Sequence, residues 1–163
     1  MPSDQEFTHL NRDGEVHMVD VGSKDSTSRI AVAEGLVRMS SGLASRFFDG
    51  DLHKGDAAAV ARVAGITGAK KTSDLIPLCH PIFLTGVEVT LEPATHGVRI
   101  TATVSTTGQT GVEMEAMTAV STAALTVYDM VKSVERDVTI ETVRLVHKAG
   151  GRSGEWTRPK VVD

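Results

Sequence analysis

The alternation of apolar and polar residues along the chain predicts four β-strands. Residues 29–39, with the sequence RIAVAEGLVRM, alternate closely enough to form a first strand. Residues 83–93 and 97–108 alternate as well, and the short turn between them predicts a β-hairpin. Residues 138–150, VTIETVRLVHKAG, predict the last strand.

Helical patterns separate these strands. Residues 41–50 predict a short helix, and the alanine-rich residues 55–76 predict a second helix with Asp56 as its N-cap. Residues 111–136 predict a long third helix. The order strand, helices, two strands, helix, strand is that of the α+β, ferredoxin-like split βαβ fold, in which helices pack on one face of an antiparallel sheet.

A chain of 163 residues without an internal repeat or a linker predicts a single domain, residues 1–163. The polar N-terminal region, about residues 1–16, and the tail, about residues 152–163, are expected to be flexible. Residues 83–91 place apolar side chains on both faces of their strand in places. A second subunit is therefore expected to cover the open face of the sheet, which predicts a homo-oligomer.

The composition narrows the class of protein. A net charge of -4 and 4% aromatic residues argue against nucleic acid as a partner. No run approaches the roughly 20 apolar residues of a membrane helix. A single cysteine and a polar N-terminus without an apolar signal core predict a cytoplasmic protein. The six histidines include no pair at helical spacing, and no CxxC or HExxH motif is present, so no metal site is expected.

The stretch DLIPLCHPIFL, residues 74–84, places His80 between Pro77 and Pro81 and beside Cys79. A metal or redox pair is the weakest interpretation, because partner ligands are lacking and neighbours in an extended segment point to opposite faces. A core histidine explains the apolar flanks but not the prolines. A positioned histidine explains both, because the prolines restrict the backbone on either side.

The long predicted helix carries two sets of charges. Asp129 and Lys132 are three residues apart among apolar neighbours, which favours partial burial and a tuned acid/base pair, although an ordinary helical ion pair fits equally well. Glu113 and Glu115 lie at the start of the same helix. Glu115 and Asp129 are then about 21 Å apart on a straight helix. Either the first turn bends away, or two subunits build each site.

Basic residues beside glycines or a helix start indicate phosphate binding. Lys54 directly precedes the second predicted helix, and Lys148 and Arg152 lie in the glycine-rich sequence HKAGGRSG. Each signal is weak by itself, because lysine and glycine are ordinary loop residues.

Six segments together resemble a known family. They are HMVDVGSKDSTSRIA, HKGD, DLIPLCHP, QTGVEMEA, ALTVYDMVKSV and HKAGGRSG, which occur in this order from about His17 to Gly154. This set is similar to the cyclic pyranopterin monophosphate synthase family, the molybdenum cofactor biosynthesis accessory protein C.

The resemblance implies a lyase that converts a cyclic dihydro-GTP intermediate to cyclic pyranopterin monophosphate and releases diphosphate. It also implies a ferredoxin-like fold, a hexamer built as a trimer of dimers, and active sites at the dimer interface. The rearrangement needs proton transfers but no redox change, so no cofactor is expected. The alternative is a non-catalytic ferredoxin-like module that binds a small ligand without consuming it.

The resemblance assigns roles to individual residues. Asp129 and Lys132 match the catalytic pair, which we expect burial to bring toward neutral pKa values. The remaining matches are substrate-binding residues: Leu78, Cys79, His80, Met114 and Glu115 in contact segments, Lys54, Arg29 and Lys148 near the triphosphate, and Glu113 and His17 in matching motifs.

Overall fold

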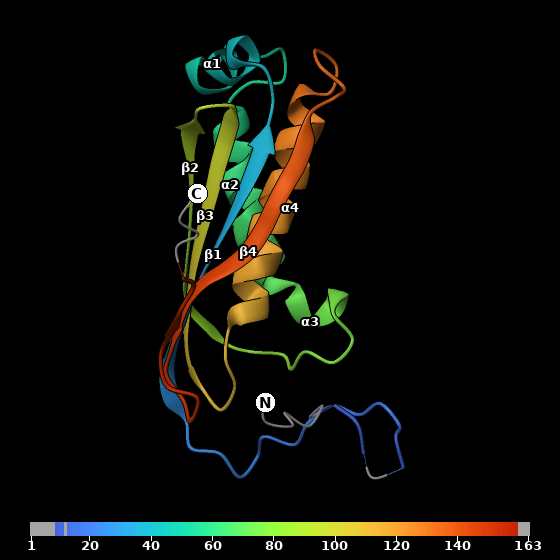
Figure 1. The fold of residues 1–163 in the computed structure, drawn as a ribbon, viewed down its shortest axis with the longest axis vertical. Coiled ribbons are helices and arrows are strands. Elements are labelled where there is room, and N and C mark those ends of the chain that lie inside the picture. The colour runs from blue at the N-terminus through green and yellow to red at the C-terminus, as the bar shows by residue number, and fades with distance from the viewer. Residues whose placement is uncertain (1–8, 12, 160–163) are drawn as a thin grey trace.

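The computed structural model describes residues 9–11 and 13–159 of the chain. In this part, strands β1 (Thr27–Arg38), β2 (Leu84–Ala94), β3 (Gly97–Gly108), β4 (Thr139–Ala149) and β5 (Trp156–Thr157) form one sheet. The helices are α1 (Ser41–Asp49), α2 (Ala57–Lys70), α3 (Thr72–Leu75) and α4 (Glu113–Val131). The sheet order is β2-β3-β1-β4-β5, and every neighbouring pair is antiparallel (Figure 1).

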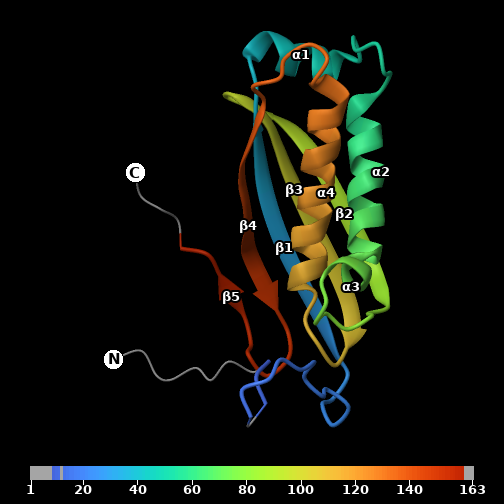
Figure 2. The same ribbon diagram turned by 90° about the vertical axis from the view of Figure 1, so that its right-hand side faces the viewer.

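The long helices α2 and α4 both lie on one face of the sheet, as the side view shows (Figure 2). The α+β architecture with an antiparallel sheet and helices on one face is therefore confirmed. The two-residue turn between β2 and β3 forms the predicted hairpin, with Ala94 paired to Gly97. At one end of the sheet α1 lies against α2, β2 and β3, while α3 lies near the first turn of α4 (Figure 1).

Side-chain caps determine where the helices begin. The carboxylate of Asp56 accepts a hydrogen bond from the Ala59 N–H at 2.9 Å, so the predicted N-cap of α2 is confirmed. Ser40 caps α1 through the Leu43 N–H, and α1 ends at Gly50 with φ 73°. These caps fix the loop between α1 and α2, which carries Lys54.

Helices α2 and α4 approach each other closely through glycine. A Cβ on Gly68 would clash with the side chain of Thr122, and one on Gly65 would lie 3.0 Å from the Ala119 carbonyl oxygen. The core between the helices and the sheet consists of small and branched side chains. Its fully buried members include Ala31, Ala33, Val37, Val98, Ile100, Ala102, Val104, Ala116, Ala119, Val120, Ala123, Val127 and Val131.

Several boundaries differ from the prediction. The long helix ends at Val131 rather than near residue 136, and the second helix divides into α2 and α3. The pairing of β5 with β4 falls inside the tail predicted to be flexible, residues 152–163. The predicted flexibility of the two ends falls in part on residues 1–8, 12 and 160–163, which lie outside the described residues.

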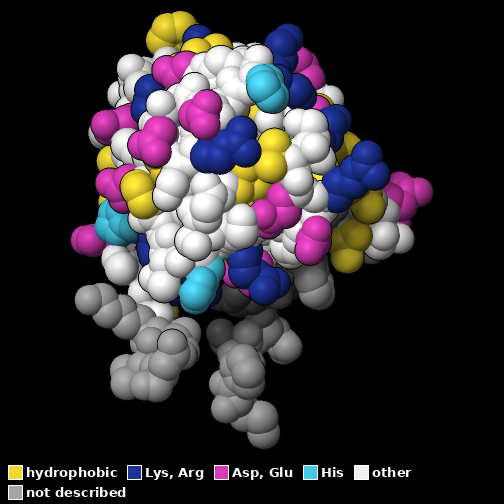
Figure 3. Space-filling view, turned by 90° about the horizontal axis from the view of Figure 1, so that it is seen from above, with side chains coloured by type: hydrophobic (Ala, Val, Ile, Leu, Met, Phe, Trp, Pro, Cys, Tyr) yellow, Lys and Arg dark blue, Asp and Glu magenta, His cyan; other side chains and the backbone are white. Residues whose placement is uncertain are grey.

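Within the described residues, no helix has both the length and the apolar composition needed to cross a bilayer. Seen from the end that carries α1, Lys and Arg side chains alternate with Asp and Glu side chains and form no continuous surface of one sign (Figure 3). Extended nucleic acid contacts need such a basic surface, so this end does not favour that class of partner.

Candidate functional site

Helix α4 separates the predicted site residues into two groups. It runs without interruption from Glu113 to Val131, so Glu115 and Asp129 lie at opposite ends of one helix, about 21 Å apart. The alternative in which the first turn bends away is therefore wrong. One end of α4 adjoins two pockets, and the other end carries a cluster of charged side chains.

The first pocket, here called the carboxylate pocket, has a volume of about 260 Å³. Its walls come from the segment before β2 and from the first turn of α4. It is lined by His9, Leu78, Cys79, His80, Ile82, Thr110, Gly111, Glu113, Met114 and Glu115. The structure thus brings together six of the predicted substrate-binding residues from two separate sequence motifs.

Glu115 is the most unusual group in the carboxylate pocket. Only 3% of its surface is exposed, although it carries a carboxyl group. Burial, with a smaller contribution from the charge of Glu113, raises the pKa of Glu115 to about 7. A carboxyl group with this pKa can hold or release a proton near neutral pH, which is the property that general acid/base catalysis requires.

Cys79 and His80 both line the carboxylate pocket, and the extended geometry that would point them to opposite faces does not apply. The segment is a turn rather than an extended strand, as the hydrogen bond from the Cys79 N–H to the Ile76 carbonyl shows. Burial, and then the charge of Glu115, raise the pKa of the Cys79 thiol. A raised pKa opposes thiolate formation, which disfavours Cys79 as a nucleophile and fits its place in the wall of the pocket.

The His80 ring is tied to the N-terminal segment. Its Nε2 lies 2.7 Å from the carbonyl oxygen of Val19. Farther along this segment, the side-chain amide of Gln109 donates to the Gly22 carbonyl at 3.1 Å. His17 is exposed, and its backbone N–H bonds to His9, so its side chain is not brought into either pocket.

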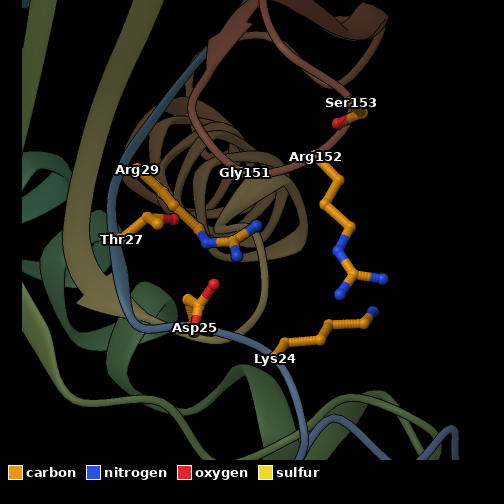
Figure 4. A pocket seen from close by; sticks show the side chains of 7 residues that line it. All are labelled: Lys24, Asp25, Thr27, Arg29, Gly151, Arg152 and Ser153. Carbon is orange, nitrogen blue, oxygen red and sulfur yellow. The ribbon is translucent and has the colours of Figure 1, made fainter.

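The second pocket, here called the cationic pocket, has a volume of about 360 Å³ and contains three basic side chains (Figure 4). It is lined by Lys24, Asp25, Thr27, Arg29, Gly151, Arg152 and Ser153. The side chains of Lys24, Arg29 and Arg152 extend into the same space from three different segments (Figure 4). Such a convergence of positive charge in a concave site favours an anionic ligand.

The hydrogen bonds of the cationic pocket leave its charges available. Arg29 donates to the carbonyl oxygens of Gly108 and Gln109, which orient its guanidinium group. Among residues 9–11 and 13–159, Lys24, Arg29 and Arg152 form no ion pair within 4 Å. The hydroxyl of Thr27 is buried and has no hydrogen-bond partner in the same part of the chain. An anion with several oxygens would satisfy the three basic side chains.

Lys148 connects the two pockets. Its ammonium group donates to a carboxylate oxygen of Glu113 at 3.0 Å and to the hydroxyl of Ser153 at 3.0 Å. Glu113 lines the carboxylate pocket, and Ser153 lines the cationic pocket. The pockets are therefore adjacent parts of one surface, with a cation at their boundary.

The helix-end cluster consists of Lys54, Asp129 and Lys132 at the other end of α4. The Asp129 carboxylate lies 2.6 Å from Lys132 and 3.4 Å from Lys54, and Lys54 also donates to the Asp129 carbonyl at 2.7 Å. Lys54 is thus not brought to Arg29 and Lys148, with which we grouped it as a triphosphate ligand.

The expected burial of the pair is wrong for this chain. The side chains of Asp129 and Lys132 are 56% and 51% exposed. Lys132, and then Lys54, lower the pKa of Asp129, while Asp129 raises the pKa of Lys132. Both pKa values move away from neutrality, because the attraction between the opposite charges outweighs the small opposing effect of desolvation.

Sequence reasoning missed part of the cationic pocket. Lys24 and Thr27 lie in a polar segment that we would read as a solvated loop, and Arg152 was only a weak candidate. Only the family motifs around these residues could have indicated that they line a pocket, because hydrophobic periodicity carries no information in loops. Among the described residues, no group of three or more His, Cys, Asp and Glu side chains is arranged to bind a metal ion.

Comparisons with known proteins identify the family of the chain. The model of the MoaC family matches residues 18–151. A cyclic pyranopterin monophosphate synthase of Corynebacterium glutamicum is 57% identical over 152 residues, covering 93% of this chain and 97% of that protein. Proteins of the same name from Corynebacterium efficiens and Roseiflexus sp. (strain RS-1) are 57% and 56% identical, and cover 93% of this chain and 98% and 97% of their own length.

Proposed function

The chain belongs to the MoaC family, and we propose that it binds a cyclic dihydro-GTP intermediate across its two adjacent pockets and converts it to cyclic pyranopterin monophosphate and diphosphate. Its activity is that of a cyclic pyranopterin monophosphate synthase, a lyase of molybdenum cofactor biosynthesis. We further propose which residues perform the reaction, how the subunits assemble and where in the cell the protein acts.

The position of Lys148 is the main support for the proposed binding mode. A nucleotide-derived substrate has a polar, hydrogen-bonding base at one end and a triphosphate at the other. The carboxylate pocket offers acceptors for N–H groups of the base, and the cationic pocket offers positive charge for phosphate oxygens. Because Lys148 contacts both Glu113 and Ser153, it lies where the two ends of such a substrate would meet.

The cationic pocket supports the departure of diphosphate. In this step a ribose hydroxyl attacks the innermost phosphorus, a new P–O ester bond forms, and the bond to the bridging oxygen of the diphosphate breaks. Negative charge then accumulates on the leaving group. Lys24, Arg29 and Arg152 would bind the outer phosphates and stabilise that charge. Arg29 is well suited to this task, because two backbone carbonyls hold its guanidinium group in place.

The carboxylate pocket supports the rearrangement of the base. Opening and re-closure of the guanine-derived ring require protons to be moved between ring nitrogens and a nearby group. Glu115 has a pKa of about 7 and is buried, so it can donate or accept such a proton with little change in hydration. Glu113 would accept hydrogen bonds from N–H groups of the base, and the imidazole of His80 lines the same pocket and could move a further proton.

The helix-end cluster reaches the substrate in our proposal because a second protomer supplies it. Asp129 and Lys132 lie about 21 Å from Glu115 along α4, which is too far for one small molecule to contact both within a chain. An active site between protomers would combine the pockets of one chain with the cluster of its partner. Burial against the partner would also provide the desolvation that tunes an Asp–Lys pair. We propose a hexamer, arranged as a trimer of dimers, with this shared site at the dimer interface.

We place the protein in the cytoplasm, because its single cysteine is free and cannot form a disulfide within the chain.

Incubation of the purified protein with the cyclic dihydro-GTP intermediate tests the function directly. We expect stoichiometric release of diphosphate and formation of the cyclic monophosphate. Binding without diphosphate release would instead establish the non-catalytic, ligand-binding alternative. Mixing a Glu115→Gln variant with an Asp129→Asn variant tests the shared site, because hybrid dimers would regain one intact site and therefore part of the activity.

A further inference from the structure

The segment after the glycine-rich loop is bound to the outer edge of the sheet. In β5, Trp156 pairs with Lys148 and Thr157 pairs with His147. The next residue, Arg158, donates its backbone N–H to the Val146 carbonyl at 2.9 Å and its Nε to the Leu145 carbonyl at 2.7 Å. These contacts lie at the end of β4 that leads into the cationic pocket.

Side chains reinforce this pairing. His147 Nδ1 lies 3.0 Å from the Thr157 hydroxyl, and the Arg158 guanidinium lies 5.7 Å from the centre of the Trp156 ring. Val146, which accepts the backbone hydrogen bond of Arg158, is skipped where β4 pairs with β1. Val32 pairs with His147, and the next residue, Ala33, pairs with Leu145. The backbone N–H of Arg158 therefore satisfies the carbonyl of a bulged residue, Val146, on the outer side.

The pairing closes a loop whose residues line the cationic pocket. Residues 150–155 join β4 to β5, and Gly151, Arg152 and Ser153 within them form part of the pocket wall. The loop lies directly on Arg29, since a Cβ on Gly151 would clash with the Arg29 guanidinium group. A loop fixed at both ends has far fewer conformations than a chain end of equal length.

Protection of the sheet edge is the simpler role for β5. Two observations instead favour a role of β5 at the neighbouring cationic pocket. The side chains of Trp156, Thr157 and Arg158 are exposed, so the segment buries little apolar surface. Its contacts are also confined to the last part of β4, beside Lys148, and leave residues 139–144 of that edge uncovered by β5.

We infer that residues 156–158 are positioning residues for the cationic pocket. They hold the 150–155 loop closed against Arg29, so that Arg152 and the Ser153–Lys148 contact face the phosphate groups of the ligand. The inference rests on the proposed function for the identity of the ligand, but the closure of the loop does not depend on it.

Two shortened chains test this role. A chain ending at Glu155 lacks β5, and a chain ending at Pro159 keeps it and serves as the matched control. We expect the shorter chain to bind inorganic triphosphate about tenfold more weakly in calorimetry, and to show a KM about tenfold higher with kcat changed less than threefold. Trypsin should cleave after Arg152 at least tenfold faster in the shorter chain, because an open loop is accessible to the protease.

Point variants keep the test independent of folding. Arg158→Ala removes two side-chain contacts, one to the Leu145 carbonyl and one to the Trp156 ring, and keeps the backbone hydrogen bond. Arg136→Ala removes the same charge from an exposed position that follows α4, at the other end of that helix from the pockets. Only Arg158→Ala should weaken triphosphate binding and speed cleavage after Arg152. Equal KM, triphosphate affinity and cleavage rate in all chains would overturn the inference and leave the function untouched. Loss of diphosphate release in the full-length protein would contradict the function, while the triphosphate and protease measurements would still decide the role of β5.

Discussion

The buried carboxyl group of Glu115 makes the stability of the protein depend on pH. The folded protein keeps this proton up to about pH 7, whereas a carboxyl group with the ordinary value of 4.5 releases it well below that. Between these values the folded state binds more protons than the unfolded state, so the free energy of unfolding decreases as the pH rises. The displacement of the pKa corresponds to about 3 kcal/mol, at about 1.36 kcal/mol for each tenfold change in proton affinity.

Glu115→Gln removes this dependence while it preserves the size of the side chain. Glutamine resembles the protonated carboxyl group and cannot ionise, so the variant should match the parent well below pH 4.5, where the carboxyl group is protonated in both the folded and the unfolded state. At pH 8 it should be more stable than the parent by up to about 3 kcal/mol, the full value of the displacement. Glu88→Gln, at an exposed position of β2, removes the same formal charge and is the control.

Urea unfolding at pH 5, 6, 7 and 8, at one protein concentration for all variants, measures the difference. The concentration is fixed because the stability of an oligomer depends on it. A stability difference between parent and Glu115→Gln that is constant with pH, or that shrinks toward pH 8, would refute a pKa raised by burial. Carbon NMR of the Glu115 carboxyl group, titrated over the same range, reports the pKa directly.

Three further predictions concern other parts of the site. Asp129→Asn should reduce turnover more than a thousandfold while circular dichroism and thermal unfolding stay unchanged, and full activity of the folded variant would contradict the catalytic assignment. Lys54→Ala removes one of the two cations that lower the pKa of Asp129, so the acidic limb of the kcat/KM profile should move to higher pH, and an unmoved limb would separate Lys54 from Asp129. Gly151→Ala should raise KM about tenfold, because φ of 72° disfavours alanine and its Cβ would displace Arg29, whereas Gly42→Ala, at an uncrowded position in α1, should leave KM unchanged.

The elements that sequence predicted well are those whose ends carry local chemical signals. The N-cap at Asp56 and the left-handed Gly50 determine helix ends through contacts within a few residues, so pattern alone locates them. The two-residue strand β5 has no periodicity to detect. It exists because the outer edge of β4 offers it partners, and that edge is a product of the folded sheet.

The errors in the site arise from assigning burial by sequence neighbours. Val127, Met130 and Val131 are buried, yet Asp129 among them is exposed. Consecutive residues of a helix are turned by about 100°, so a charged side chain can face solvent beside buried ones. Cys79 and His80 were treated as an extended pair for a similar reason, although they occupy a turn.

The composition of the pockets was only partly predictable, because their walls meet through tertiary structure. Lys24, Arg29 and Arg152 are distant in sequence and converge only after β1 and β4 pair in the sheet. The resemblance to a family supplied Arg29 and Lys148, since motifs preserve residues whose proximity no local rule reveals. It also grouped Lys54 with them, although Lys54 contacts Asp129 at the opposite end of helix α4.

The glycines between α2 and α4 have a consequence for chemistry at a distance. Gly65 and Gly68 let the two helix axes come close, and α2 begins just after the loop that delivers Lys54 to the end of α4. The 2.7 Å contact between Lys54 and the Asp129 carbonyl would exceed hydrogen-bond range if the helices separated by about 1 Å. Helix spacing therefore controls the smaller, Lys54-dependent part of the lowered Asp129 pKa, while Lys132 supplies the larger part. Gly65 and Gly68 in this way influence a carboxylate that they do not contact.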